Sequence, residues 1–150
     1  MMRRRQMMAI GMKEAEMKNM KLIKTITCNG NDTAWNINLD DDGNAFSCTE
    51  IVISLSKASI YSSYTGIGLN GIGWSIDKAI KIWYGDSAKD GCIWIECVGG
   101  GIVRYIANLG ALTTMRLKCD ALNGSDEINQ IQFRLPGAPD KGETIEIYGR

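Results

Sequence analysis

The sequence predicts an all-β protein, an antiparallel jelly-roll β-sandwich preceded by a methionine-rich, basic extension. Two observations predict the sandwich. Apolar residues recur at every second position from Leu22 onward, and turn-forming clusters separate these runs at intervals of about 10–15 residues. No interval has the length and period of a helix that would pack across a parallel sheet. Many short strands joined by such turns are typical of antiparallel sandwiches and barrels.

The extension is defined by its composition. Seven of the eight methionines fall in the first twenty residues, and residues 1–21 carry six basic and two acidic side chains, a net charge of +4 in a neutral chain. Flexible thioether side chains fill irregular apolar gaps in a partner. We therefore divide the chain into an anchoring tail, residues 1–20, and a β-sandwich domain, residues 21–150. The expected anchoring residues are Arg3, Arg4, Arg5, Met7, Met8 and Met12.

The alternating runs predict about nine strands. They lie at residues 22–28, 35–39, 51–55, 80–84, 93–97, 103–107, 115–119, 131–135 and 145–147. Residues 66–76, GIGLNGIGWSI, mix glycine with large apolar residues, which suits either a bent strand or a close approach of two backbone segments. This segment is not a dinucleotide-binding fingerprint, because no strand-to-helix pattern surrounds it.

Side-chain chemistry suggests two hairpins among the expected strands. The first sets Trp83 opposite Trp94 and Lys81 opposite Glu96. The second sets Phe133 opposite Ile145 and Arg134 opposite Thr144. In both registers apolar residues meet apolar residues and charged residues meet polar or oppositely charged ones, whereas a shift by one residue would turn charges toward the core.

The residue types exclude most enzyme classes. The chain has no histidine, so Ser-His-Asp and Cys-His catalysis and the usual zinc hydrolase sites are absent. We expect no enzyme, no cofactor and no metal. A small glycosidase acting through Asp86 and Asp90 stays as a minor alternative. The run from Asp40 to Asn44 is rich in oxygen ligands, but it lacks the spacing of an EF-hand, and a surface turn is the preferred interpretation.

The cysteines predict free thiols. There are five of them, widely spaced and without a Cys-x-x-Cys motif, so neither a disulfide framework nor a zinc ribbon is expected. Cys92 and Cys97 are five residues apart, which places them on opposite faces of a regular strand. We expect most of these thiols to be buried.

The aromatic residues form two candidate interface surfaces. In the first hairpin register, Trp83 and Trp94 share the polar face, where they could stack on sugar rings, cover a neighbouring subunit or lie under a loop of the same chain. The second candidate surface consists of Tyr61, Tyr64 and Trp74, near the glycine-rich segment.

The tail is not expected to bind nucleic acid strongly, because three arginines supply few phosphate contacts and no aromatic residue lies among them. No window approaches the ~18 apolar residues of a membrane span, and the apolar patch at 7–12 is shorter and more broken than the core of a signal peptide. We expect neither membrane insertion nor secretion by that route.

Both ends of the chain resemble bacteriophage virion proteins built on small jelly-roll domains. The sequence INQIQFRL, a Pro/Gly loop and GETIEIYGR are similar to the C-terminal hairpin of those domains, and the opening MMRRRQMM resembles their short leaders. The residues that carry the C-terminal likeness are Ile128, Ile131, Phe133, Gly142, Ile145, Ile147, Tyr148 and Gly149.

The resemblance implies a tail, baseplate or head-fibre component located in the virion. Its leader would dock on other virion proteins, and its sandwich would form a homo-oligomer, with a trimer favoured, or contact a host-surface glycan. The alternative from another class is a carbohydrate-binding module that uses the tryptophan pair and does not need the tail.

Overall fold

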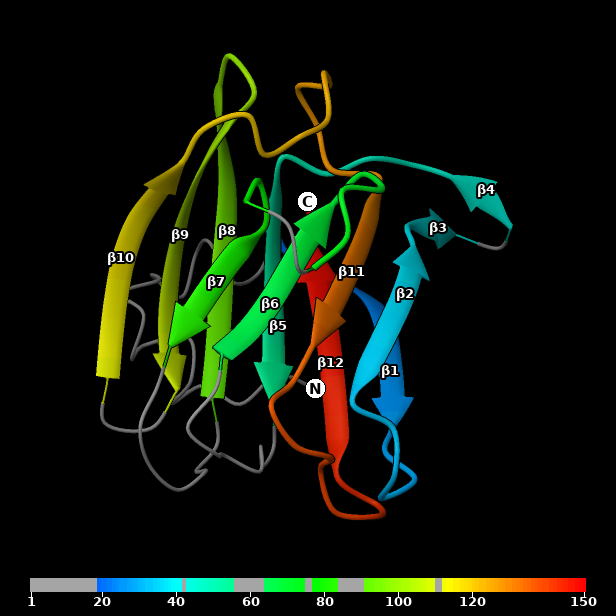
Figure 1. The fold of residues 1–150 in the computed structure, drawn as a ribbon. Helices are drawn as coiled ribbons and strands as arrows, with labels where there is room; N and C mark the ends of the chain where they lie inside the picture. Colours follow the sequence, from blue (N-terminus) through cyan, green and yellow to red (C-terminus); the bar gives the residue numbers. More distant parts are fainter. Residues whose placement is uncertain (1–18, 42, 56–63, 75–76, 84–90, 110–111) are drawn as a thin grey trace.

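A computed structural model describes residues 19–41, 43–55, 64–74, 77–83, 91–109 and 112–150 of the chain. Within these ranges every regular element is a β-strand, and all neighbouring strands run antiparallel (Figure 1). The prediction of an antiparallel all-β protein is confirmed. No helix long and apolar enough to cross a membrane occurs among these residues. Residues 1–18 of the predicted tail lie outside the described ranges.

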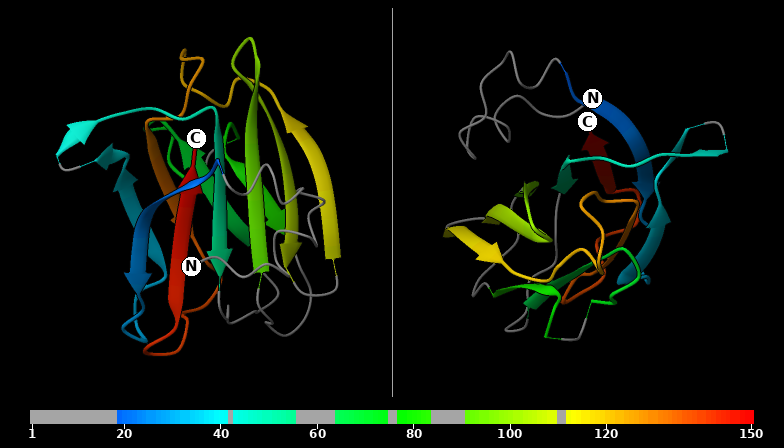
Figure 2. Two further views of the ribbon diagram at one scale, coloured as in Figure 1. Left: turned by 180° about the vertical axis from the view of Figure 1, so that it is seen from behind. Right: turned by 90° about the horizontal axis from the view of Figure 1, so that it is seen from above.

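The larger sheet has six strands in the order β1-β12-β5-β8-β9-β10. Figure 2 shows this sheet from behind, with the blue β1 at one side and the yellow β10 at the other. Its strands are β1 (Lys21–Thr27), β12 (Thr144–Gly149), β5 (Glu50–Leu55), β8 (Gly91–Gly99), β9 (Ile102–Leu109) and β10 (Leu112–Lys118).

The smaller sheet has four strands in the order β2-β11-β6-β7. A separate short hairpin, β3-β4, follows β2 in the chain. Its strands are β2 (Ala34–Asn38), β11 (Gln130–Arg134), β6 (Tyr64–Leu69) and β7 (Ile80–Trp83), and the hairpin is β3 (Asp40–Asp41) and β4 (Asn44–Ala45). Each of the nine expected strands corresponds to an observed one. The smaller sheet contains one further strand, β6, within the glycine-rich segment.

The two sheets face each other across a single apolar core. Alternate side chains of each strand point inward, as a period of two requires, and they join one buried cluster with members from both sheets. Phe133 of β11 is 1% exposed and stacks on Trp35 of β2, with ring centroids 5.1 Å apart. Ile53, Ile95 and Ile147 of the larger sheet complete the opposite wall.

The glycines of β6 permit a close approach of two backbone segments. A Cβ atom on Gly68 would lie 2.2 Å from the carbonyl oxygen of Gly73, and one on Gly66 would lie 2.4 Å from that of Trp74. The chain after β6 therefore folds back onto the outer side of its own strand. The expected close approach of two backbone segments is confirmed over the described residues, and residues 64–69 of this part of the chain form the strand β6.

Both predicted hairpins are wrong. β7 lies in the four-stranded sheet and β8 in the six-stranded sheet, so Trp83 is opposite Tyr64, and Trp94 is opposite Val52 and Ile106. β11 and β12 are likewise divided between the sheets. Phe133 is paired with Trp35 and Ile67 instead of Ile145.

The error has a physical reason. Two successive strands whose apolar residues point into one core have matching alternation whether they pair edge to edge or face each other from opposite sheets. Compatible side chains therefore fit both arrangements. β7 and β8 belong to different sheets, as do β11 and β12, and alternation alone contains no information about that division.

Candidate functional site

The structure separates the two tryptophans of the predicted pair. Trp94 lies on β8 of the six-stranded sheet, whereas the backbone of Trp83 lies in β7 of the four-stranded sheet, opposite Tyr64. Tyr64 and Trp74 both lie on the outer side of the four-stranded sheet. The remaining predicted site residues lie outside the described ranges: Arg3, Arg4, Arg5, Met7, Met8, Met12 and Tyr61.

Two surfaces therefore need separate description. The six-strand outer face consists of the side chains of β1, β12, β5, β8, β9 and β10 that point away from the core. The four-strand outer face consists of the corresponding side chains of β2, β11, β6 and β7, together with residues 70–74, which fold back over β6.

Trp94 is the centre of a polar network on the six-strand outer face. Its indole N–H donates to Oε2 of Glu50 at 3.1 Å, and the guanidinium of Arg104 lies 5.2 Å from the centre of the ring system. Arg104 also pairs with Glu96 at 2.6 Å, and Arg150 donates to both carboxylate oxygens of Glu50 at 3.1 Å. Each cation in this network has a carboxylate of the same chain as its partner.

A small apolar cluster lies beside this network on the same face. Its buried members are Val52, Cys92 and Tyr148, and the half-buried side chains of Met20, Trp94 and Ile106 pack against them. Such a cluster, separate from the main core, stabilises the outer side of the sheet through burial of apolar area. Met20 is the last methionine of the predicted tail, so the end of the tail contacts this face.

The six-strand outer face ends in an exposed apolar edge. Met115 and Leu117 of β10 are 66% and 64% exposed. In the register with β9, Met115 is opposite Ile106 and Leu117 is opposite Arg104, so both side chains share the face that carries Trp94. Among the described strands, β10 has β9 as its single neighbour. An open edge strand with adjacent apolar side chains is a surface for association.

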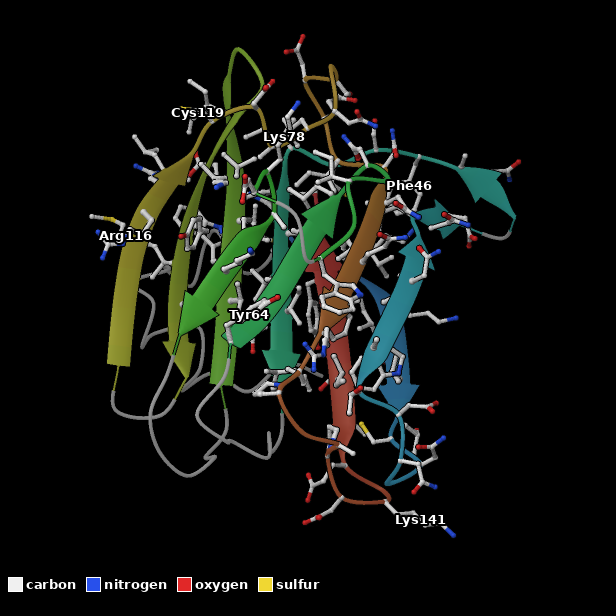
Figure 3. All side chains as sticks on the ribbon, in the orientation of Figure 1. Phe46, Tyr64, Lys78, Arg116, Cys119 and Lys141 are labelled. Atoms are coloured by element: carbon white, nitrogen blue, oxygen red, sulfur yellow. The ribbon has the colours of Figure 1, made fainter. Side chains whose placement is uncertain are left out.

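The four-strand outer face presents two cations over aromatic rings. Nζ of Lys81 on β7 lies 5.4 Å from the ring centre of Tyr64, and the guanidinium of Arg134 on β11 lies 4.8 Å from the ring centre of Trp74. Figure 3 labels Tyr64 at the start of β6 on this face. Among the described residues, neither Lys81 nor Arg134 forms an ion pair. In this respect they differ from Arg104 and Arg150.

A row of amides continues this face toward β2. Gln132 is opposite Asn36 on β2 and Gly68 on β6. The side-chain N–H of Gln130 donates to the amide oxygen of Asn36 at 2.6 Å, whereas Oε1 of Gln130 is buried and has no hydrogen-bond partner among the described residues. Amides both donate and accept hydrogen bonds, so this row is suited to ligands rich in hydroxyl groups.

Asn70 holds the loop that carries Trp74. Its Nδ2 donates to the carbonyl oxygens of Leu122 at 2.9 Å and Glu127 at 2.8 Å, and its Oδ1 accepts the N–H of Asn129 at 2.8 Å. The backbone of Asn70 adopts a φ of 55°, a left-handed conformation that asparagine tolerates better than most residues. The turn after β6 is thus fixed to the segment that precedes β11.

A groove of about 380 Å³ lies between the start of β1, the β4 strand and the end of the chain. Lys21, Phe46 and Arg150 are among its lining residues. The ammonium of Lys21 lies 6.0 Å from the ring centre of Phe46, at the limit of a cation–π contact. The groove contains none of the aromatic residues that the sequence singled out.

No cluster of three potential metal ligands occurs among the described residues. Asp40 and Asp41 form β3, and Asp42 lies outside the described ranges. Asp86 and Asp90, the residues of the glycosidase alternative, also lie outside them.

The cysteines are free, as predicted. Cys28, Cys48 and Cys92 are buried, Cys97 is half-buried and Cys119 is exposed. The expected opposition of Cys92 and Cys97 is confirmed, since Cys92 belongs to the outer cluster and Cys97 packs against the main core. Burial raises the pKa of Cys92 to about 12. Burial, with the charge of Glu127 second, raises the pKa of Cys48 to about 11. These thiols are protonated and unreactive at neutral pH.

No family model and no curated protein matches the sequence. The two outer faces of the sheets are therefore the candidate functional surfaces. Sequence reasoning selected Tyr64 and Trp74 but missed their partners Lys81 and Arg134, because it assigned both cations to hairpins that do not form. The available signal was the alternation of Arg134 with Phe133, which already placed the arginine on the outer side of its strand.

Proposed function

We propose that the chain is a structural protein of a bacteriophage particle, of the fibre or decorating type. In this proposal a jelly-roll body self-assembles and presents its free surface to the host, and the methionine-rich segment 1–20 docks on other virion proteins. The likeness of both chain ends to phage virion proteins is one support. The buried, unpaired thiols are a second, since virion proteins that assemble in a reducing cytoplasm keep their cysteines reduced.

The strand order supports a jelly roll. Without the β3-β4 and β9-β10 hairpin strands, eight strands are left, and in chain order they form the sheets 1-8-3-6 and 2-7-4-5. This order results when a long hairpin of eight strands wraps around a core, which is the jelly-roll arrangement of viral capsid and lectin domains. A fold is shared by many functions, so this support is an analogy.

The single observation that carries self-assembly is the exposed edge of β10. A strand with one neighbour presents unpaired backbone groups, and here it also presents two adjacent large apolar side chains, Met115 and Leu117. Proteins usually protect such edges with charges or cover them with a partner. A second copy of the chain is the proposed cover, and a trimer is the expected assembly.

Sedimentation equilibrium of the full chain tests this proposal. We expect a trimer for the native sequence and a monomer for the double variant Met115→Lys, Leu117→Lys, because the two charges would be desolvated at the contact. A chain that lacks residues 1–20 is expected to stay trimeric. The matched control is Lys24→Gln, on the exposed β1 strand far along the sheet. A monomeric native chain, or a double variant that stays trimeric, would contradict assembly through β10.

A further inference from the structure

We propose that the four-strand outer face binds an acidic oligosaccharide, a chain of sugars that carry carboxylate groups. This proposal deepens the surface-contact part of the proposed function by naming the ligand class. It does not depend on assembly through β10, which lies on the other sheet. The site is built from Tyr64, Trp74, Lys81 and Arg134, with the amide row beside them.

The four-strand outer face carries a positive charge. The outward positions of the four strands, where side chains are described, contain two cations and no carboxylate. These positions are Ala34, Asn36, Asn38, Tyr64, Gly66, Gly68, Lys81, Gln130, Gln132 and Arg134. Residues 22–150 have a net charge of −4, so a positive face is a local exception that the overall composition does not predict. An anion is the complementary ligand.

Aromatic rings hold the two cations of this face in position. Both rings are half-buried, and each supports a cation within contact distance of its face. Stacking restricts the guanidinium of Arg134 before any ligand arrives, which lowers the entropy lost on binding. A planar guanidinium can donate two parallel hydrogen bonds to a carboxylate.

Uncharged side-chain amides lie on the same face as the two cations. Gln132 and Gln130 lie in the same strand as Arg134, at successive outward positions. Asn36 and Asn38 are exposed on the neighbouring strand. Sugar hydroxyls donate and accept hydrogen bonds, so a row of amides next to a cation fits a sugar chain with one charge per unit.

These features favour a sugar over a nucleic acid. Two cations neutralise few phosphates, and binding to nucleic acid depends mainly on such contacts. The aromatic faces are also partly covered by the cations, which leaves little flat surface for base stacking. An acidic sugar chain needs fewer ionic contacts and uses the amide row.

The test is calorimetric titration of the full chain with a hexamer of galacturonic acid. We expect binding that weakens with added salt, and we expect Arg134→Gln and Lys81→Gln each to reduce the affinity about tenfold, since each removes one charge-assisted contact. Arg116→Gln is the matched control. It removes the same charge from an exposed position on β10, labelled in Figure 3, and should change the affinity less than about twofold.

Three further ligands separate the alternatives. A neutral hexamer of glucose should not bind measurably, whereas equal binding would overturn the requirement for acidic sugars. Polyglutamate of equal charge should bind more weakly, because it lacks hydroxyls for the amide row, and equal binding would reduce the site to a general anion surface. Single-stranded DNA that bound in place of the uronate hexamer would overturn the proposal in favour of nucleic acid.

The folded state of each variant is checked by its urea midpoint, and its mass is measured in the same samples. A native chain that does not bind the uronate hexamer overturns this inference whatever its mass. A monomer that binds the hexamer supports it while contradicting assembly through β10. The two proposals therefore fail separately.

Discussion

The two outer faces of the sandwich use the same pair of residue types for opposite purposes. On the six-strand outer face, Arg104 lies over Trp94 and is neutralised by Glu96. On the four-strand outer face, Arg134 lies over Trp74 and has no carboxylate partner among the described residues. The first arrangement is complete within the chain and contributes to stability. The second leaves a charge for a ligand, which is why we place binding there.

The register explains this difference. On the six-stranded sheet, Glu96 is directly opposite Arg104, so the ion pair forms between neighbouring strands. On the four-stranded sheet, Arg134 is opposite Ala34 on one side and Gly66 on the other, and Lys81 is also opposite Gly66. Small residues at these positions leave the cations uncompensated, and the backbone of Trp74 covers Gly66.

Trp94→Ala on the six-strand outer face is expected to lower the free energy of unfolding most. The substitution removes a half-buried ring, its hydrogen bond to Glu50 and its contact with Arg104. We expect the free energy of unfolding to fall by about 3 kcal/mol, at the lower end of the range for large aromatic truncations. Urea unfolding measures this, and titration with the uronate hexamer should show unchanged affinity.

Trp74→Ala is the counterpart on the other face. Its ring supports Arg134, which has no carboxylate partner among the described residues, so we expect a loss of about 1 kcal/mol in stability. The affinity for the uronate hexamer should fall with it, since the guanidinium is no longer held. If Trp74→Ala destabilised the fold as much as Trp94→Ala, the distinction between a structural and a binding face would fail.

Gly68→Ala is expected to cost slightly less than Trp94→Ala. The new methyl would collide with the backbone of Gly73, which is not the flexible end of a side chain, so the covering loop must move. We expect a loss of about 2 to 3 kcal/mol, typical of overpacking, together with a shift of Trp74 fluorescence. An unchanged midpoint and spectrum would show that residues 72–74 do not rest on β6.

Asn70→Ala removes the hydrogen bonds that hold the same loop, and we expect it to lower the stability less than Gly68→Ala does. Three hydrogen bonds are lost, and the carbonyl groups of Leu122 and Glu127 lose a donor, so we expect destabilisation of about 2 kcal/mol. Asn70→Gly retains the left-handed backbone and separates conformational strain from the loss of hydrogen bonds. Equal stability of the glycine variant and the native chain would mean that the side-chain hydrogen bonds of Asn70 contribute nothing to the free energy of unfolding.

The sequence predicted the strands and their inward faces well because alternation is a local property. Phe133 and Ile53 were placed in the core by their position in an alternating run, and the structure buries both. The strand at 64–69 was harder to predict, because glycines occupy the outward positions at which polar side chains usually indicate a strand. These glycines are needed because the backbone of residues 73 and 74 lies against them.

Sheet membership could not be predicted from the same signal. The candidate site depends on which strands are neighbours, and Lys81 was assigned to Glu96 when β7 and β8 belong to different sheets. The pairing of Arg134 with Trp74 joins residues sixty positions apart through a loop that folds back over β6. Such a contact depends on tertiary packing, for which the sequence has no local marker.

A further difference between the two faces concerns the pH dependence of the six-strand outer face. Cys92 points outward from β8, yet burial raises its pKa to about 12 from an ordinary value of 9.0. Above about pH 9 the unfolded chain loses a proton that the folded chain retains, so the free energy of unfolding falls as the pH rises toward about 12. Below about pH 9 both states are protonated and this contribution is constant.

The expected slope from this one thiol is about 1.4 kcal/mol per pH unit. Other groups titrate in the same range, so the measurement is the difference between the native chain and Cys92→Val, compared by urea unfolding from about pH 8.5 to about pH 10.5. The valine variant should lose less stability over this range. Parallel curves for the two proteins would mean that water reaches Cys92, and the apolar cluster on this face would then not be the dry, self-contained structure that distinguishes it from the four-strand outer face.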